Sequence, residues 1–355
     1  MKALRFHNAR DLRLDEVSPP REPLADQVVL KVLQCGICGT DLHEYVAGPI
    51  MLPVKPHPEN GAKIPIILGH EFSATVTSVG PAATATKPGD RVAILPHLMK
   101  SGDYYVRRNL GQFSATTGLV GLAWHWGGMG EFAAVPEQNV VKLPDTVSDE
   151  QGALLEPSAV AVNAIDAAGV VVGSTVLITG AGPIGALVAL AARAAGASKI
   201  FVYEPNGSRR ARLAEFDGVS VYGESPADLV EAIQEQTDCR VGVDASIECA
   251  GHQGALDLCI EATRRTGTIA QVGLFVDRPK IDMFKVCEKG LNLVGCWGND
   301  ITLGPRLVAM IASGRFPVER IITGRVSLKD AVSDGFETLT RKDNDHLKIL
   351  IKVAA

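Results

Sequence analysis

The sequence lacks the features that would place a chain in a membrane or on nucleic acid. No apolar run is long enough to span a bilayer, because Gly180 and Pro183 interrupt the apolar stretches around them. The first residues, 1–15, are polar and contain no apolar segment of a secretory signal. The formal net charge is -5, whereas a phosphate-binding surface needs a clustered excess of Lys and Arg. We therefore expect neither a membrane nor a nucleic-acid partner.

Cysteine shows no disulfide pattern. The chain has 7 cysteines, an odd number, and only Cys35 and Cys38 form a C-x-x-C. A zinc knuckle needs a second pair of this kind, which the other cysteines do not provide. Together with the polar N-terminus, this usage favours a reduced, cytoplasmic location.

Metal-binding residue types gather in two short stretches of the N-terminal part. The first is G-I-C-G-T-D-L-H, residues 36–43, and the second is Gly69-His70-Glu71. They offer a thiolate, an imidazole and a carboxylate, which suit a catalytic zinc site that keeps one position open for water or substrate. The competing interpretation is a redox pair formed by Cys35 and Cys38.

The chain divides into two parts with different residue patterns. Its 355 residues are also more than one hydrophobic core ordinarily holds, so two domains are expected. Up to about Leu143, short β segments bounded by Gly and Pro predict a barrel-like or Greek-key β domain. After about Val147, apolar strands alternate with helical segments, which is typical of a parallel sheet covered on both faces. The expected strands are Val28–Leu33, Thr75–Val79, Arg91–Leu95, Phe132–Val135 and Val140–Leu143 in the first part, and Ser174–Thr179, Lys199–Tyr203, Val241–Ile247, Thr268–Val272 and Leu291–Val294 in the second.

The motif G-A-G-P-I-G, residues 180–185, lies between a predicted strand and a predicted helix. In this context Gly180 makes a tight turn, Gly182 lets the backbone approach a pyrophosphate, and Gly185 permits close packing of helix on strand. The start of the helix then supplies N–H groups and a partial positive charge to the phosphates. The motif predicts a dinucleotide-binding site.

The type of dinucleotide is indicated by Glu204, at the end of the next strand. A carboxylate there hydrogen-bonds the adenosine ribose diol and repels a 2′-phosphate, so NAD is favoured. Arg209 and Arg210 keep NADP as the alternative.

The order of these motifs resembles the zinc-dependent medium-chain alcohol and polyol dehydrogenases over essentially the whole chain. It also includes L-G-H-E-F, G-D-R-V and L-E-P, which begin at Leu68, Gly89 and Leu155. The resemblance implies an α/β chain with a GroES-like β-rich catalytic domain, residues 1–157 and 296–355, and a doubly wound Rossmann domain, residues 158–295. It also implies an active site between the two domains.

The resemblance further implies which residues form the metal site. Cys38 and His70 are the expected zinc ligands, and the carboxylate comes from Glu71 or Glu156, a choice that stays open. Asp41 matches the carboxylate that fixes the tautomer of a ligand histidine.

Proton transfer and cofactor binding follow from the same resemblance. Thr40 matches the hydroxyl that takes the substrate proton, and His43 matches the imidazole that passes it to solvent. Together with the motif analysis, the expected cofactor-binding residues are Gly180, Gly182, Pro183, Ile184, Gly185, Glu204, Arg209 and Gly273.

Within the family, the stretch H-E-Y-V-A-G-P-I at residues 43–50 looks most like the 2,3-butanediol dehydrogenase branch. This implies NAD-dependent oxidation of a vicinal diol, or reduction of the matching hydroxyketone, by a homodimer or homotetramer. A sorbitol-like polyol, threonine or a simple secondary alcohol is the alternative substrate. A rival from another class is a non-catalytic NAD-binding protein, against which the retained Cys38, His70 and Glu156 speak.

One segment, residues 96–118, departs from the family pattern, and we call it the lobe. Most relatives carry four cysteines there that close a structural zinc site, but the corresponding positions here are Lys100, Asp103, Val106 and Ser114. We predict one catalytic zinc and no structural zinc. Packing of Leu98, Tyr104, Tyr105 and Phe113, more than an ion pair of Lys100 with Asp103, is expected to order the lobe.

A few further residues are assigned from their position alone. The expected pocket residues are Tyr45, Ile50, Leu274 and Trp297. We expect His57 and His97 to lie in solvated loops, and His125, which stands between two tryptophans, to pack or to line a pocket rim.

Overall fold

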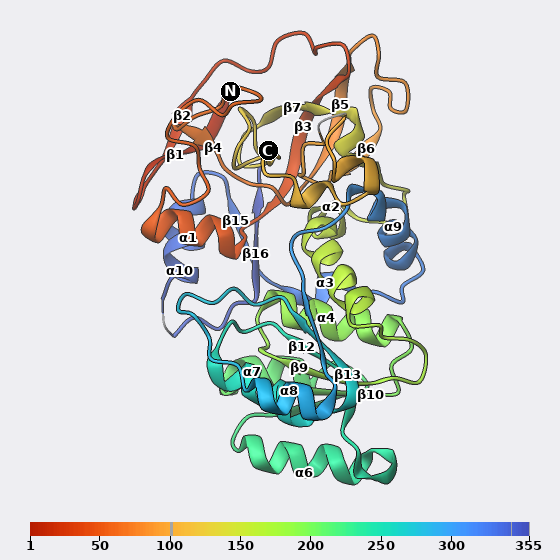
Figure 1. Cartoon of the computed structure of the whole chain (residues 1–355). Helices are drawn as coiled ribbons and strands as arrows, with labels where there is room; N and C mark the ends of the chain where they lie inside the picture. The colour runs from red at the N-terminus through yellow and green to blue at the C-terminus, as the bar shows by residue number, and fades with distance from the viewer. Residues whose placement is uncertain (100–101, 342, 355) are drawn as a thin grey trace. The chain divides into compact units, whose positions relative to one another are not determined.

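The structure, a computed structural model, describes residues 1–99, 102–341 and 343–354, which form two compact units (Figure 1). Unit 1 comprises Met1–Glu156, Asn299–Gly314 and Ile322–Ala355, and unit 2 comprises Pro157–Gly298 and Arg315–Ile321. The two ends of the chain therefore share unit 1, and unit 2 is inserted between them.

The C-terminal division differs from the sequence prediction, which gave all of residues 296–355 to the catalytic domain. The 3-10 helix η6 (Val318–Ile321) packs on α4 (Pro183–Ala194) of unit 2. The Arg320 guanidinium lies 4.6 Å from the centre of the Phe216 ring. Burial of apolar side chains against α4 decides where this short segment belongs.

Unit 1 is built on two sheets. One has the order β2-β1-β4, and the other has the order β15-β16-β3-β5-β6-β8, with β7 also pairing with β3. The strands are β1 (Lys2–Asn8), β2 (Asp11–Glu16), β3 (Gln27–Gly36), β4 (Ile66–Ile67), β5 (Phe72–Val79), β6 (Arg91–Ile94), β7 (Phe132–Pro136), β8 (Val140–Lys142), β15 (Ile322–Ser327) and β16 (Lys348–Lys352). The helices are α1 (Gly39–Ala47), α2 (Asp149–Ala153), α9 (Gly304–Ala312) and α10 (Glu337–Leu339), and α3 (Leu155–Ala167) begins here and continues into unit 2.

Strand β3 is the centre of unit 1, because it pairs with β5, β7 and β16. Its residues Val28, Leu30 and Val32 alternate along the strand and are fully buried, as the two-residue period of a strand requires. They belong to one apolar core that also holds Phe72 of β5 and Ile94 of β6. This core fixes the end of β3, beyond which Cys38 lies.

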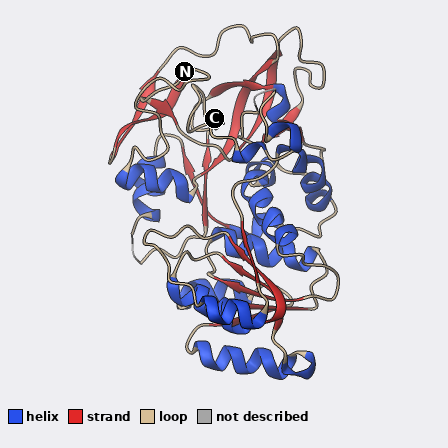
Figure 2. Ribbon diagram, in the orientation of Figure 1, coloured by secondary structure: helices blue, strands red, loops and turns tan. Residues whose placement is uncertain are grey.

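Unit 2 is a parallel sheet with the order β11-β10-β9-β12-β13-β14. Figure 2 shows its strands in red, flanked by helices in blue. Its strands are β9 (Thr175–Thr179), β10 (Lys199–Tyr203), β11 (Val219–Tyr222), β12 (Val243–Glu248), β13 (Thr263–Gln271) and β14 (Asn292–Gly295). The connecting helices are α4, α5 (Gly207–Ala214), α6 (Pro226–Gln236), α7 (Gln253–Ala262) and α8 (Met283–Lys289). The chain leaves β9 in one direction to β10 and later returns on its other side to β12, so the order reverses beside β9, where such sheets bind ligands.

The structure confirms the predicted fold class, a β-rich unit and a unit with a parallel sheet and helices. Within the described residues, no helix has both the length and the apolar character that crossing a bilayer requires.

Candidate active site

Strand ends bring distant parts of unit 1 together. The register places Cys35 of β3 opposite Phe72 of β5, and Leu350 of β16 opposite Gly36 of β3. The residues just beyond the end of β3, just before β5 and at the start of β16 therefore converge. Two of these segments are the metal-binding stretches found in the sequence.

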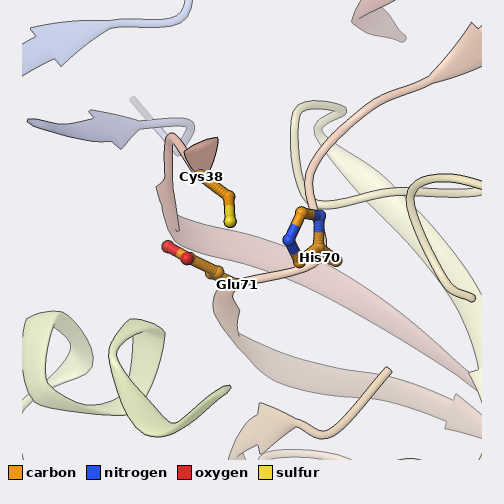
Figure 3. Close-up of side chains that lie close together, drawn as sticks. All are labelled: Cys38, His70 and Glu71. Carbon is orange, nitrogen blue, oxygen red and sulfur yellow. The ribbon is translucent and has the colours of Figure 1, made fainter. Parts of the chain in front are cut away.

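The side chains of Cys38, His70 and Glu71 form one cluster (Figure 3). Each offers one ligand atom, and these atoms all lie within 4.8 Å of one another. The thiol of Cys38 points toward the space between the other two residues, while the Glu71 carboxylate points away from the His70 ring (Figure 3). In the described part of the chain no other such group of Cys, His, Asp and Glu side chains converges.

The carboxylate of Asp41 lies beside the imidazole of His70. The Asp41 Oδ1 to His70 Nδ1 distance is 3.6 Å, and both side chains are buried. The other oxygen, Oδ2, accepts a hydrogen bond of 3.0 Å from the Cys38 N–H, because Asp41 occupies the third position of α1. Burial lowers the pKa of His70, but the negative charges of Asp41 and Cys38 outweigh burial and leave this pKa above its ordinary value.

Glu71 is held by a residue that the sequence did not point to. Lys348 Nζ donates to both Glu71 oxygens, over 2.8 and 2.7 Å, and to the carbonyl of Ile37 over 3.0 Å. Lys348 is only 2% exposed, so this ion pair is shielded from water. Gly36 leaves the necessary space, because a Cβ there would collide with the Glu71 carboxylate. Lys348 opens the apolar strand K-I-L-I-K, and its partner is set by strand register rather than by local pattern.

Glu156 is not a member of the cluster, but the charges of His70, Glu71 and Lys348 act on its carboxylate. It is buried in the first turn of α3, and Asn299 Nδ2 donates to its Oε1 over 3.2 Å. Burial raises the pKa of Glu156 to about 7, a shift that the positive charge of His70 opposes. A bound cation would stabilise its charged form.

Thr40 and His43 lie on α1, three residues apart and therefore on neighbouring positions of one helix face. The Cys38 sulfur lies 3.8 Å from the Thr40 hydroxyl oxygen. His43 is exposed, whereas Thr40 is half-buried. The pair thus extends from the cluster toward the surface.

The residues of the cluster fit a zinc ion. Thiolate, imidazole and carboxylate are zinc donors, and a buried Asp41–His70 pair is the usual support of a ligand histidine. His70 Nδ1 and Asp41 Oδ1 are both buried and have no hydrogen-bond partner among the described residues. Such atoms are costly in an apolar interior, so the site is arranged for a charged group. By contrast, Cys35 is fully buried, which raises the pKa of its thiol and argues against a redox dithiol.

The lobe is ordered by hydrogen bonds to Asp103. This carboxylate accepts from the N–H groups of Tyr105 and Val106, over 2.7 and 3.1 Å, and from the Ser114 hydroxyl over 3.0 Å. Asp103 and Ser114, two of the positions that carry cysteine in relatives, are therefore joined directly. Lys100, the predicted partner of Asp103, lies outside the described residues.

The predicted packing of the lobe is wrong for its three aromatic residues, whereas the fourth residue, Leu98, is half-buried and packs against the core of unit 1. Tyr104 is 56% exposed and Phe113 is 44% exposed, and Tyr105 is exposed as well. Tyr104 stacks instead under the Arg108 guanidinium, 3.9 Å from the ring centre. A short lobe closed by its own hydrogen bonds has too little interior to bury three large rings.

Two assignments made from position alone are also wrong. His97 is 4% exposed rather than solvated, because the loop that carries it is tied down by Asn139. Tyr45 is buried in the core of unit 1, where its hydroxyl donates to Glu337. Its neighbour Ile50 is exposed, and His125 is exposed with Nε2 3.0 Å from the Asn60 carbonyl.

The glycine motif of unit 2 forms the predicted turn between β9 and α4. Gly180 has a φ of +92°, which favours glycine, and a Cβ on Gly185 would collide with the Gly180 carbonyl. The space beside Gly182, which precedes α4, is open. Pro183, which has no N–H group, and Ile184 are the first two residues of the helix. The N–H groups that follow Pro183 in the first turn would face a phosphate bound there.

Glu204 closes this turn from β10. Its Oε2 accepts from the Ala181 N–H and its Oε1 from the Asn206 N–H, each over 2.8 Å. Arg210 Nη1 donates to the carbonyls of Glu204 and Pro205, over 3.0 and 2.7 Å. Glu204 is thus buried and oriented at the sheet edge that carries the glycine turn.

A second buried carboxylate, Glu248, was missed by the sequence analysis. It ends β12 and accepts from the N–H groups of Ala250 and Gly251, each over 2.9 Å, and from the Gln271 amide. A Cβ on Gly273 would collide with the Gly251 N–H, so glycine is required for this close approach. An acidic residue followed by C-A-G at a strand end was the available signal, and it parallels Glu204 on the other side of β9.

Comparison with known proteins agrees with this architecture. Residues 24–145 match the family model of the alcohol dehydrogenase GroES-like domain, and residues 183–313 match the model of zinc-binding dehydrogenases. The first match lies within the β-rich unit, and the second covers most of the parallel-sheet unit and continues into residues 299–313 of unit 1. The chain belongs to the family of zinc-binding, alcohol dehydrogenase-like oxidoreductases, as its motifs predicted.

Individual relatives span the full length of the chain. The (R,R)-butanediol dehydrogenase of Bacillus subtilis (strain 168) is 36% identical, over 99% of this chain and 99% of that protein. Human sorbitol dehydrogenase is 32% identical, over 99% of this chain and 95% of that protein. The crystal structure of 2R,3R-butanediol dehydrogenase from Bacillus subtilis superimposes with a TM-score of 0.92, at 35% identity and over 99% of each chain.

Proposed function

We propose that this protein oxidises a secondary hydroxyl of a vicinal diol with NAD, or reduces the matching hydroxyketone with NADH, at a single zinc site. The observation that carries the proposal is the cluster of the half-buried Cys38 with the buried His70 and Glu71 in a chain similar to butanediol dehydrogenases. Bound zinc would act as a Lewis acid that lowers the pKa of the substrate hydroxyl.

Cys38 and His70 hold the metal in this proposal, and Asp41 orients His70. Both oxygens of Glu71 already accept from Lys348, so Glu71 neutralises the buried ammonium. Glu156, which has one hydrogen-bond donor in Asn299, is the carboxylate ligand that we propose. In this assignment Glu71 balances the charge of Lys348, and Glu156 balances part of the charge of the metal.

The proton of the substrate hydroxyl leaves along α1. The Thr40 hydroxyl, next to Cys38, accepts this proton as it passes its own onward, and the exposed His43 imidazole transfers a proton to water. A hydroxyl suits the first position because it both donates and accepts a hydrogen bond.

NAD is the proposed dinucleotide. Its pyrophosphate would bind at the open space beside Gly182 and the start of α4, and Glu204 would accept from the ribose hydroxyls. Each oxygen of Glu204 receives one backbone hydrogen bond and retains a second lone pair. Arg209 lies in the first turn of α5, five residues after Glu204, and would be the residue to test if NADP were preferred.

The test is NADH formation from the separate stereoisomers of 2,3-butanediol, with sorbitol, threonine and 2-butanol beside them and a chelator-treated sample as control. We expect one butanediol isomer to be oxidised fastest and the activity to be lost with chelator. Equal rates with NADP would contradict the assignment of Glu204. Turnover that persists without metal would contradict the zinc mechanism.

A polyol such as sorbitol is the second candidate substrate, because the human relative is a sorbitol dehydrogenase and is nearly as similar. The same assay decides between them. We also propose a homodimer or homotetramer, which sedimentation at several protein concentrations would test.

A further inference from the structure

Glu248 ends β12 and is fully buried, yet the proposed reaction gives it no role. Its Oε1 accepts from the N–H groups of Ala250 and Gly251, each over 2.9 Å. Its Oε2 accepts from the Gly251 N–H over 3.0 Å and from the Gln271 amide. A carboxylate has about four lone-pair sites, so these bonds occupy both oxygens. Glu248 therefore acts on a ligand only through the groups that it holds.

Those groups belong to the turns that follow β12 and β13. The Gly273 N–H donates to the Glu248 carbonyl over 2.8 Å, and the Gln271 amide donates to the Gly273 carbonyl over 2.7 Å. The two turns touch, because a Cβ on Gly251 would collide with the Leu274 carbonyl. Glu248 thus fixes the two turns against each other with both its side chain and its main chain.

The turn after β12 lies directly beside the glycine motif. A Cβ on Gly180 would lie 3.1 to 3.3 Å from atoms of Ala250, and the Cys249 N–H donates to the Thr179 carbonyl over 2.9 Å. Glu204 lies on the other side of β9, just after β10. The two buried carboxylates therefore flank the glycine turn at the edge where the strand order reverses.

This placement divides the proposed cofactor between the two carboxylates. A doubly wound sheet binds the two nucleotide halves of a dinucleotide across the point where the strand order reverses. In the proposed function the adenosine half lies on the side of Glu204. The nicotinamide half then lies over the turns after β12 and β13, where the Leu274 side chain is 61% exposed. An apolar side chain and main-chain polar groups suit a flat ring that carries a carboxamide.

We propose that Glu248 is a positioning residue for the nicotinamide half of the cofactor, which it holds in place through the turns at Gly251 and Gly273. This inference rests on the proposed function and adds a residue to the binding of its cofactor. Hydrogen bonds to a charged acceptor are stronger than those to a neutral one, so loss of the charge loosens both turns.

The other end of β12 carries a carboxylate with a structural role alone. Asp244 accepts from the Thr175 N–H over 2.8 Å and pairs with the Arg264 guanidinium over 2.8 Å. Its side chain is 37% exposed and lies at the opposite edge of the sheet, because β9 and β12 are parallel. Asp244 ties the same strands as Glu248 without reaching the cofactor edge, so it provides the matched control.

The experiment measures the Kd of NADH, and of ADP-ribose, which lacks the nicotinamide, by calorimetry on the zinc-loaded protein. We expect Glu248→Gln to raise the Kd of NADH about 10-fold, and that of ADP-ribose less than about 3-fold. Glu248→Asp keeps the charge and the acceptors for the next N–H groups, so it should recover part of the affinity. Asp244→Asn should lower the unfolding temperature and leave both Kd values unchanged.

Gln271→Ala tests the same network without removing a buried charge. The Gln271 side chain is only half-buried, and it links Glu248 to the Gly273 carbonyl. Its loss should raise the Kd of NADH several-fold and again spare ADP-ribose. This variant decides the question if Glu248→Gln does not fold.

Two results would overturn the inference. Unchanged Kd values for NADH in these variants would mean that Glu248 only ties strands together. An equal rise for NADH and ADP-ribose would mean that it supports the glycine turn and not the nicotinamide half. Either result leaves the proposed function standing when the native enzyme oxidises a diol with NAD. A selective loss of NADH affinity upholds the inference even if none of the tested alcohols is oxidised.

Discussion

The metal cluster and the lobe lie in the same unit, yet they differ in whether their polar atoms find hydrogen-bond partners within the chain. At the metal cluster, His70 and its neighbour Asp41 are buried and each keeps a polar atom without a hydrogen-bond partner among the described residues, so the site is arranged for a cation. In the lobe, the oxygens of Asp103 accept hydrogen bonds from neighbouring N–H and hydroxyl groups, while large aromatic rings remain exposed. Polar atoms left without partners therefore mark a site for a cation, whereas polar atoms satisfied within the chain mark a segment that is ordered by its own hydrogen bonds.

The largest expected effect is that of Cys38→Ala. This change removes the thiolate, so bound zinc and turnover should both fall below detection while the fold is kept. Zinc content and NADH formation measure the two losses, and circular dichroism monitors the fold. Retention of zinc by a folded, inactive variant would show that the metal lies elsewhere.

Removal of the buried partner of Glu71 should strongly destabilise unit 1. Lys348→Met leaves a buried carboxylate without its counter-charge, which costs about 3–5 kcal/mol of unfolding free energy. Urea unfolding of the metal-free protein measures the loss, and Glu71→Gln in the same chain should recover most of it. The matched control is Lys142→Met, which breaks an exposed pair with Asp90 and should cost about 1 kcal/mol or less. A loss no larger than that of the control would mean that the Lys348 pair contributes no more than an exposed one.

Asp41→Asn should act on the metal through His70. The amide keeps the size of the carboxylate but removes the charge beside His70 Nδ1, so zinc affinity should fall about 10- to 100-fold. Competition with a chromogenic chelator measures the affinity. An unchanged affinity would show that Asp41 serves only the start of α1.

The smallest effect concerns the lobe and its dependence on pH. Hydrogen bonds from the Val106 and Tyr105 N–H groups and the Ser114 hydroxyl lower the pKa of Asp103. A lowered pKa contributes stability above the ordinary pKa of Asp, and this contribution is lost as the pH falls through the lowered value. Hydrogen-exchange protection of residues 104–114 should decrease on acidification and in Asp103→Ala, and should not respond to chelator. Asp145→Ala, outside the lobe, is the control, and chelator-sensitive protection would indicate a metal in the lobe.

The sequence pattern predicted those strands and turns that short runs of residues determine. The strands β3, β9 and β10 and the turn at Gly180 lie within a few residues of the predicted positions, because apolar runs and glycines mark them directly. The family and the two-unit architecture are confirmed as well. The roles of Cys38 and His70 as zinc ligands stay predictions, although the fold brings their side chains together.

The missed residues depend on contacts between distant segments. Lys348 meets Glu71 only because β16 pairs with β3, and no neighbouring residue signals this partner. His97 is buried because Asn139 holds its loop, although loop histidines are ordinarily exposed. Both contacts combine one charged or polar side chain with a partner more than forty residues away.

The zinc content of the purified protein and of Cys38→Ala tests the central claim most directly. We expect about one zinc ion per chain in the native protein and none in the variant, with the lobe unchanged. Two zinc ions per chain, or one that survives in Cys38→Ala, would contradict it.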